Sequence, residues 1–328
     1  MAVLSGGRSS EHEVSLSSAA SIREGLEQAG HRPLEIEVGR DGVWRRDGRE
    51  LAVIPGRGLE GADVVFPALH GPFGEDGTVQ GLIECLDVAY VGAGVLASSL
   101  CMDKAMFKEL MRLNGIPQVG YRVVRAEELA GDAGRVPALI DELGLPVFVK
   151  PARLGSSLGI SRVGAEGELL PALEAAFAHD PLALVEAAAT GLEVECSVIG
   201  NGDPIASAPG EILLGAGEEG WYDYAAKYSP GGMQLIVPAR VPDHVRERIR
   251  ELATRSFRLV GCSGLARVDF FVEGERVLVN ELNTMPGFTA TSVFARLFEA
   301  GGLAYPQLLD RLLELALERH ADEQRYSF

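Results

Sequence analysis

Cysteine is scarce in this sequence, with four residues among 328. No two of them form a C-x-x-C pair, and a chain of this length can bury a sufficient core without disulfides, so we expect buried free thiols in a reducing compartment. The four are Cys85, Cys101, Cys196 and Cys262. The six histidines are equally dispersed and include no H-x-x-x-H pair, which argues against a zinc site.

Positive charge and long apolar runs are also in deficit. Thirty Lys and Arg residues face 47 Asp and Glu residues, and the resulting net charge of −17 argues against a nucleic-acid partner. No apolar run reaches the length of a membrane span, and residues 2–7 lack the charged and apolar regions of a signal peptide. We therefore expect a cytoplasmic protein with no membrane partner, in which a few local cations and a metal can still bind a nucleotide.

The commonest nucleotide-binding and hydrolase motifs are absent or badly placed. No G-x-x-x-x-G-K-[ST] occurs, which excludes a P-loop. Gly92-Ala93-Gly94 follows a strand, as a dinucleotide fingerprint does, but it comes late in the chain, so a glycine-rich domain connection is the better interpretation. Gly155-Ser156-Ser157-Leu158-Gly159 fits the hydrolase pattern with Ser157 as nucleophile, yet it stands too far from the preceding strand. A loop that embraces phosphate oxygens, or a plain surface turn, fits it better.

What is present is a regular alternation of strand and helix patterns. The chain begins with a buried strand and a Gly6-Gly7 turn, followed by a helix that Ser10-x-x-Glu13 would open as a capping box. Strand–helix–strand alternation predicts a parallel sheet with helices on its faces. The expected strands of this first region are 2–4, 33–38, 63–69 and 88–91, and its second helix is 78–86.

Two further regions follow, with boundaries near Leu96 and Val185. The middle region is a small α+β module. Its expected helices are 102–114 and 127–143, and its strands are 121–124, 147–150 and 160–163. The last region has strands at 193–199 and 234–237, helices at 242–259 and 307–319, and a hairpin of strands 266–272 and 276–281. A long loop at 215–232, rich in glycine and tyrosine, indicates a lid.

The hairpin carries the strongest chemical signal. Residues two apart on a strand share a face, so Arg267 and Asp269 face one way, as do Glu281 and Asn283. If the strand register brings these faces together, one patch holds two carboxylates, an amide and a guanidinium. Oxygen ligands of this kind suit Mg²⁺ that bridges nucleotide phosphates, whereas charges that simply face water are the alternative. The apolar residues expected to face a core are Val268, Phe270, Leu278 and Leu282.

Together with other short motifs, this hairpin resembles the ATP-grasp superfamily and, within it, the D-alanine–D-alanine ligases. The motifs occur in the family's order and span residues 5–292. They are Gly6-Gly7-x-x-x-Glu11-x-Glu13-Val14-Ser15, Leu69-His70-Gly71, Met102-Asp103-Lys104, Val149-Lys150-Pro151, Gly155-Ser156-Ser157-x-Gly159, Tyr222-Asp223-Tyr224-x-x-Lys227-Tyr228 and Glu281-x-Asn283-x-x-Pro286-Gly287. The resemblance implies an α/β fold with α+β elements in a three-domain ATP-grasp architecture. The domains are an N-terminal parallel-sheet domain (1–96), a small ATP-grasp subdomain (97–185) and a C-terminal ATP-grasp subdomain (186–328) with the metal site and lid.

The resemblance also implies a role for each matching residue. The residues that would bind ATP are Lys104, Lys150, Ser156, Glu186, Glu193 and Lys227, and those that would hold two Mg²⁺ or Mn²⁺ ions are Asp269, Glu281 and Asn283. The substrate and catalytic residues are Glu11, His70, Ser156, Tyr228, Arg267, Gly287 and Ser292. From the residues alone, the lone lysines and glutamates are equally surface charges, Glu11 a helix cap and His70 a satisfied loop histidine.

The implied reaction uses ATP to join two D-alanine molecules for peptidoglycan synthesis. The carboxylate of the first D-alanine attacks the γ-phosphorus, and the amine of the second attacks the resulting acyl phosphate. Glu11 would pair with the first ammonium group and Ser292 with the second carboxylate. Arg267 and the backbone N–H of Gly287 would stabilise the oxyanion. The resemblance further implies a homodimer.

Several alternatives remain open at this point. Tyr228 resembles the dipeptide-forming branch, but a D-alanine–D-lactate ligase or another ATP-grasp ligase would share most motifs. A serine hydrolase using Ser157 and a non-catalytic nucleotide-binding protein are the others. The chain departs from the family pattern at residues 187–189, three alanines where a lysine and large side chains commonly flank adenine, and at Ala290.

Overall fold

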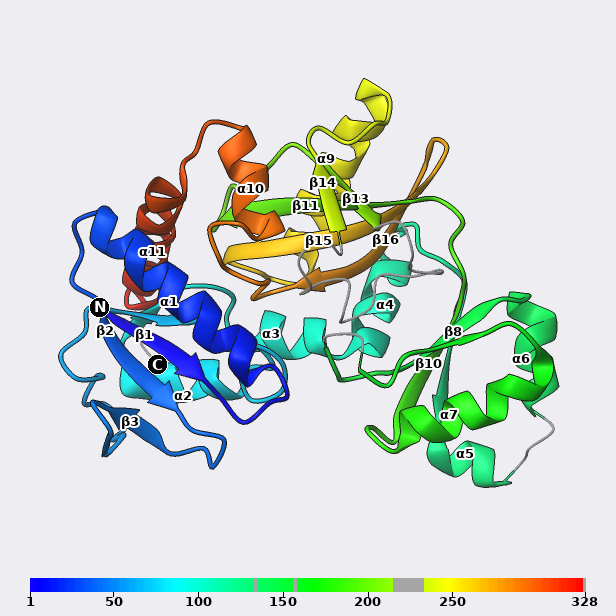
Figure 1. Cartoon of the computed structure of the whole chain (residues 1–328), viewed down its shortest axis with the longest axis horizontal. Coiled ribbons are helices and arrows are strands. Elements are labelled where there is room, and N and C mark those ends of the chain that lie inside the picture. The colour runs from blue at the N-terminus through cyan, green and yellow to red at the C-terminus, as the bar shows by residue number, and fades with distance from the viewer. Residues whose placement is uncertain (132–134, 156–157, 215–232, 327–328) are drawn as a thin grey trace.

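The computed structural model describes residues 1–131, 135–155, 158–214 and 233–326, which form three β-sheets flanked by helices (Figure 1). The sheets follow one another along the chain, in the order expected from the sequence. The domain boundaries themselves remain a prediction, and one strand, β10 (Leu182–Ala187), crosses the boundary placed near Val185. Within the described ranges, no helix combines the length and the apolar character needed to cross a membrane.

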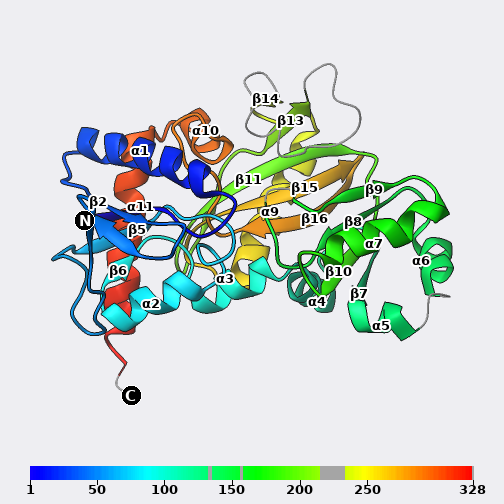
Figure 2. The same cartoon turned by 60° about the horizontal axis from the view of Figure 1, so that its bottom comes forward.

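The N-terminal sheet consists of β1 (Ala2–Gly6), β2 (Leu34–Val38), β3 (Trp44–Arg46), β4 (Arg49–Glu50), β5 (Val64–Pro67) and β6 (Ala89–Tyr90), in the order β4-β3-β2-β1-β5-β6. Strands β1, β2, β5 and β6 are parallel as expected, whereas β3 and β4 add an antiparallel edge. Helices α1 (His12–Gln28) and α11 (Tyr305–Glu323) share one apolar core with this sheet. Helix α2 (Thr78–Leu86) packs on the other face, as Figure 2 shows.

The start of α1 differs from the capping box predicted for Ser10 and Glu13. The helix begins at His12, its N-cap is Glu11, and the side chain of Glu11 makes no capping hydrogen bond. The reason lies in the preceding turn, because Ser9 donates from Oγ to the carbonyl of His70 at 2.6 Å and accepts from the backbone N–H of Glu11 at 3.2 Å. The turn thereby presents the Glu11 carboxylate away from the helix end.

The second sheet is antiparallel and has the order β7-β10-β8-β9. Besides β10, its strands are β7 (Tyr121–Arg125), β8 (Val147–Pro151) and β9 (Ser161–Val163), and its helices are α5 (Ala126–Gly131), α6 (Arg135–Leu143), α7 (Leu169–Phe177) and the 3₁₀ turn η1 (Glu166–Glu168). The sequence analysis did not predict β10 or α7. Val149 of β8 and Val185 of β10 are fully buried with Leu173 of α7, which places the core of this region between the sheet and that helix.

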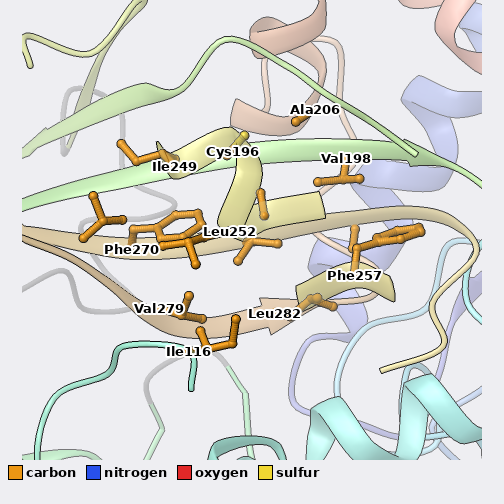
Figure 3. Close-up of a cluster of buried hydrophobic side chains, with 14 of the residues drawn as sticks. Ile116, Cys196, Val198, Ala206, Ile249, Leu252, Phe257, Phe270, Val279 and Leu282 are labelled. Atoms are coloured by element: carbon orange, nitrogen blue, oxygen red, sulfur yellow. The ribbon is translucent and has the colours of Figure 1, made fainter. Parts of the chain in front are cut away.

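The third sheet is also antiparallel, with the order β14-β13-β11-β15-β16 and β12 paired to β11. Its strands are β11 (Leu192–Gly200), β12 (Ile205–Ala206), β13 (Gly210–Leu214), β14 (Met233–Ile236), β15 (Gly264–Glu273) and β16 (Arg276–Asn283), and its helices are α9 (Asp243–Leu259) and α10 (Val293–Ala300). Helix α9 covers the core face, where Figure 3 shows Ile249, Leu252 and Phe257 against Cys196, Val198, Phe270, Val279 and Leu282.

A β-bulge between β15 and β16 corrects one predicted core residue. Asp269 pairs with Glu281, but the next residue, Phe270, pairs with Val279, so Asn280 is the extra residue of β16. The bulge shifts the alternation of β16 by one position. Val268, Phe270 and Leu282 therefore face the expected core, whereas Leu278, which lies opposite Phe271, is buried on the other face.

Two further expectations need correction. The helix predicted at 102–114 is broken at Asp103, which ends α3 (Val95–Met102) and caps α4 (Lys104–Leu113) by accepting a hydrogen bond from the N–H of Met106 at 3.0 Å. All four cysteines are free as expected, but Cys85 is exposed, because it lies on the outer side of α2.

Candidate active site

A cavity of about 730 Å³ is lined by residues from all three sheets. Twelve of the residues singled out from the sequence lie within the described ranges, and all twelve line it: Glu11, His70, Lys104, Lys150, Glu186, Glu193, Arg267, Asp269, Glu281, Asn283, Gly287 and Ser292. The other four, Ser156, Ser157, Lys227 and Tyr228, lie outside the described residues. Positions spread over some 280 residues of sequence thus converge on one enclosed space.

The floor of the cavity carries a row of carboxylates on three adjacent strands. Glu195 of β11 lies directly opposite Asp269 of β15, which lies directly opposite Glu281 of β16. Arg267 pairs with Asn283 one step along, so the two faces predicted from the sequence do meet. Like charges directly opposite one another destabilise a sheet, so this row requires cations for its stability.

Basic side chains already supply some of that positive charge. Arg267 donates from Nε and Nη2 to the two oxygens of Asp269, at 2.7 Å each, and its Nε lies 2.9 Å from Oε2 of Glu195. Lys104, the first residue of α4, lies 3.6 Å from Oε2 of Glu281 and donates to the carbonyl of Leu154 at 2.9 Å. The carboxylates of this row are therefore contacted by protein cations at the edge of the cavity.

The same row fits a hard divalent cation. Among the described residues, no three His, Cys, Asp or Glu side chains converge closely enough to hold a metal alone. Mg²⁺, however, usually takes one or two carboxylates and completes its shell with water and substrate phosphates. Asp269 and Glu281 are such a pair, and the amide of Asn283 lies beside them, with its Nδ2 donating to Oδ2 of Asp269 at 3.0 Å. The donor set therefore suits Mg²⁺ bound together with a phosphate ligand.

A second charged cluster lies on the small sheet and on α4. Lys150 lies next to the end of β8, and its Nζ contacts Oε2 of Glu186 on the adjacent strand β10. The other oxygen, Oε1, lies 2.6 Å from Nζ of Lys108. Burial works to raise the pKa of Glu186, but the two lysines outweigh it and lower that pKa to about 2. Glu186 is therefore a buried carboxylate that remains ionised, and it is not the surface charge that its sequence context also allowed.

Glu11 enters the cavity from the start of α1. Its side chain is buried, and its Oε2 lies so close to two glycines that a Cβ added at Gly71 or Gly155 would approach it to 2.5 Å or 3.1 Å. Gly71 also has a φ of +70°, which other residues rarely adopt. Two chain turns thus lie against the carboxylate, and its position favours a role in the site over a role in helix capping.

His70 is fixed by hydrogen bonds on both ring nitrogens. Its Nδ1 lies 3.0 Å from the carbonyl oxygen of Met285, which can only accept, so Nδ1 carries the proton. Nε2 then accepts from Oγ of Ser18 at 3.1 Å, and Ser18 accepts from the N–H of Phe288 at 3.3 Å. Burial lowers the pKa of His70. The histidine is therefore neutral, and it ties the N-terminal domain to the segment that follows β16.

That segment brings the remaining predicted residues to the cavity. Gly287 lines the cavity with open space around its α-carbon, and Ser292, at the start of α10, donates from Oγ to the carbonyl of Thr289 at 2.7 Å. Between them, Phe288 packs against the rings of Phe66 and Phe294, with centroids 5.4 Å and 5.1 Å away. This aromatic contact fixes the segment against the N-terminal sheet.

Three residues of the site were not predicted from the sequence. Glu195 stands two residues after Glu193 on one strand, and Lys108 stands one helical turn after Lys104, so periodicity could have placed both on the same faces as their predicted neighbours. Glu75 had no such signal, because its position depends on how a loop packs. Burial and the nearby Glu11 raise the pKa of Glu75 to about 8, and its Oε1 accepts from the N–H of Gly71 at 3.0 Å.

Comparison with known proteins agrees with this geometry. The model of the "D-ala D-ala ligase C-terminus" family matches residues 110–314, and that of the "D-ala D-ala ligase N-terminus" family matches residues 50–93. The chain is 45% identical to a D-alanine–D-alanine ligase of Deinococcus radiodurans, over 96% of this chain and 98% of the relative, and 42% identical to one of Halothermothrix orenii, over 97% and 98%.

Solved structures of similar proteins extend over the whole fold. The D-alanine–D-alanine ligase of Coxiella burnetii superimposes with a TM-score of 0.87 at 36% identity, over 99% of this chain and 95% of that chain. The VanG D-Ala:D-Ser ligase of Enterococcus faecalis superimposes with a TM-score of 0.85 at 34% identity, over 96% and 98%. The likeness therefore extends over all three sheets.

Proposed function

The chain belongs to the D-alanine–D-alanine ligase family, and we propose how its residues divide the work of joining two D-alanine molecules with ATP. In this reaction a carboxylate oxygen of the first D-alanine attacks the γ-phosphorus, and ADP leaves. The amine of the second D-alanine then attacks the acyl carbon, and the bond to phosphate breaks. The products are D-alanyl-D-alanine, which supplies peptidoglycan synthesis, ADP, inorganic phosphate and one proton.

Lysines bind the phosphates of ATP in this proposal. Lys104 and Lys150 line the cavity with their ammonium groups on Glu281 and Glu186, so both can turn toward an anion that enters. Lys227 and Ser156 are assigned to the same task by resemblance. Glu186 and Glu193 lie toward the nucleoside. The three alanines at 187–189 leave the end of β10 without large side chains, which predicts few contacts to the base from that segment.

Three oxygen ligands, Asp269, Glu281 and Asn283, would hold two Mg²⁺ or Mn²⁺ ions. The ions, when bound, supply positive charge to the phosphates as the γ-phosphoryl group is transferred. What supports this assignment is the cross-strand pairing of Asp269 with Glu281, beside the amide of Asn283. Arg267 and Lys104, which contact these carboxylates, hold them in place until the nucleotide arrives.

The acyl-transfer step uses residues from the start of α1, from β15 and from the segment that follows β16. Glu11 pairs with the ammonium group of the first D-alanine, because its carboxylate is buried against Gly71 and Gly155. Arg267 and the N–H of Gly287 stabilise the oxyanion of the tetrahedral intermediate, for which preorganised donors are the usual device. Ser292 binds the carboxylate of the second D-alanine, and neutral His70 lines its subsite. Ser156 and Tyr228 complete the proposal as the residues that close the site with Glu11.

One observation carries the proposal: Asp269 and Glu281 are direct cross-strand partners, and two lysines line the cavity above them. The test is release of phosphate from ATP in the presence of D-alanine, D-serine, D-lactate or L-alanine, with Mg²⁺. Turnover with D-alanine and none with L-alanine is expected. D-Serine is included because a D-Ala:D-Ser ligase is among the similar structures. If D-alanine alone gives no phosphate, the ligase assignment fails.

The other proposals have separate tests. A homodimer in the cytoplasm follows from the family resemblance, and light scattering of the purified protein measures the oligomeric state. The hydrolase alternative is not favoured by the family match, and a fluorophosphonate probe is expected to leave Ser157 unlabelled.

A further inference from the structure

Lys108 is a buried cation that the reaction described above does not use. Its side chain is 1% exposed, yet it carries an ammonium group 2.6 Å from Oε1 of Glu186. The same ammonium group lies 5.5 Å from the centroid of the Tyr121 ring. Lysine is almost never fully buried unless it is paired, so the pair with Glu186 explains how the fold tolerates the charge.

The two lysines on Glu186 are not equivalent. Lys150 lines the cavity together with Glu186, whereas Lys108 approaches the carboxylate from α4, behind it, and does not line the cavity. A ligand that enters the cavity can therefore reach Lys150, but it cannot reach Lys108. Two ammonium groups thus share the single carboxylate of Glu186.

The distribution of lysine along the chain also singles out this cavity. Of the 30 Lys and Arg residues only four are lysine: Lys104, Lys108, Lys150 and Lys227. Among the described residues, every ion pair between a lysine and a carboxylate lies at this cavity, while the surface pairs use arginine or histidine. An ammonium group is a compact point charge, whereas a guanidinium group is a wide planar fork. Among the described residues, lysine therefore occurs only at this cavity and directly behind it.

We propose that Lys108 is a positioning residue that keeps Glu186 neutralised when Lys150 leaves it for a nucleotide phosphate. The two lysines differ in the charge that remains on Glu186 when one of them moves away. Removing one partner of a buried ion pair exposes the other as an uncompensated charge, which opposes the removal. With Lys108 on Oε1, Lys150 can move to a phosphate and Glu186 stays paired. Without Lys108, Lys150 and Glu186 would form a closed neutral pair that competes with the phosphate for Lys150.

The surrounding charges act differently on the two lysines. Burial lowers the pKa of Lys108, and Lys150 lowers it further, so the attraction of Glu186 offsets only part of the decrease. The pKa of Lys150 is raised, because Glu186 and Glu281 outweigh its burial. Lys150 is thus held by carboxylates on two sides, so its release toward a ligand requires a substitute cation on at least one of them.

The test is nucleotide binding to Lys108→Met, measured by calorimetry on the full chain. The inference rests on the proposed function, so binding of ADP to the wild-type protein is measured first, and its absence would count against the proposed function alone. If ADP binds, Lys108→Met is expected to weaken ADP by about tenfold, the loss of one charged hydrogen bond, while adenosine, which lacks phosphates, changes by less than about twofold. A variant that binds ADP as the wild type does would overturn the inference. Equal weakening of ADP and adenosine would also overturn it, because a merely structural role predicts that result.

Two further variants keep the test decisive. Arg112→Met removes a positive charge from the same helix at an exposed position, so its ADP affinity should match the wild type. In Glu186→Gln the carboxylate is absent, so adding Lys108→Met should change the ADP affinity by less than about twofold. Lys108→Met alone leaves Lys150 and Glu186 as a neutral pair and therefore creates no unpaired buried charge, and circular dichroism checks that this variant folds. A further tenfold loss in the double variant would refute the role of Glu186 as the link between the two lysines.

Discussion

Arg267 binds Asp269 through two parallel hydrogen bonds, from Nε to Oδ1 and from Nη2 to Oδ2, each 2.7 Å long. The two residues stand two positions apart on β15 and share one face of the strand. A guanidinium group and a divalent cation compete for the oxygens of the same carboxylate, because both are cations that bind oxygen ligands. The contact of Arg267 with Glu195, at 2.9 Å, gives the guanidinium a second carboxylate to hold when Asp269 turns to another cation.

Asp269→Asn is expected to lower turnover by about a hundredfold or more, because the amide removes a charge that binds cations in the transition state. Phosphate release in the presence of ATP, Mg²⁺ and D-alanine measures it. Glu275→Gln, in the turn of the same hairpin, removes an exposed carboxylate and should leave turnover unchanged. Circular dichroism that matches the wild type would separate loss of chemistry from loss of fold, and near-normal rates in Asp269→Asn would refute the proposed role.

Glu75→Gln is expected to change the free energy of unfolding more favourably at pH 8 than at pH 5. The difference between its effects at the two pH values should be at least about 1 kcal/mol. Burial and Glu11 raise the pKa of Glu75 from its ordinary 4.5 to about 8. Between these values the folded state holds a proton that the unfolded state has lost, so the stability due to this group falls as the pH rises. Glutamine keeps the hydrogen bond from the N–H of Gly71 and does not titrate. Urea denaturation at both pH values would contradict the prediction if the variant and the wild type showed the same pH dependence.

His70→Gln is expected to reduce the loss of stability between pH 7 and pH 5 by about 1 kcal/mol. Burial lowers the pKa of His70 below its ordinary 6.5. As the pH falls below 6.5, the unfolded state takes up a proton that the folded state does not, so the stability of the wild type decreases. Thermal melts at the two pH values report the difference. A variant that loses as much stability as the wild type would show that His70 is not a source of this pH dependence.

Arg319→Ala is expected to lower the free energy of unfolding by about 2–4 kcal/mol, because several hydrogen bonds are lost at once. Arg319 donates to the carbonyls of Gly92 and Tyr90 and to Oγ of Ser263, and its guanidinium lies 4.1 Å from the centroid of the Tyr90 ring. Arg311→Ala, an exposed change on the same helix, should cost less than about 1 kcal/mol. If urea denaturation shows that both changes lower the free energy of unfolding equally, the buried contacts of Arg319 do not contribute to stability.

The hairpin of β15 and β16 could be predicted because the alternation of polar and apolar residues on both of its strands determines it. Arg267, Asp269, Glu281 and Asn283 alternate with apolar residues, and a hairpin that buries the apolar set must bring the polar set together. The family resemblance then placed Glu11 and the lysines, which periodicity alone left as ordinary caps or surface charges.

Some features that the sequence did not predict depend on contacts between distant segments, and others on local signals that the helix and strand patterns concealed. The bulge at Asn280 moved Leu278 off the expected core face, and Asp103 divided one predicted helix by capping its second half. Glu11 was interpreted as part of a helix start, but Ser9 hydrogen-bonds to the loop at His70 and turns the carboxylate toward the cavity. Ser9 and His70 lie 61 residues apart, so no local pattern records their contact, whereas Asp103 caps its helix only three residues on and is a local signal.

Helix α11 packs on the sheet that begins the chain, where Leu308, Leu309 and Leu312 are fully buried with Ile22, Leu26 and Phe66. During synthesis, the first strands leave the ribosome about 300 residues before the helix that covers one of their faces. The N-terminal sheet must therefore wait with exposed apolar surface, or with a chaperone bound to it, until residues 305–323 are made. The usual sequence of domain-by-domain folding from the N-terminus cannot be completed for this domain until the translation of α11 is finished.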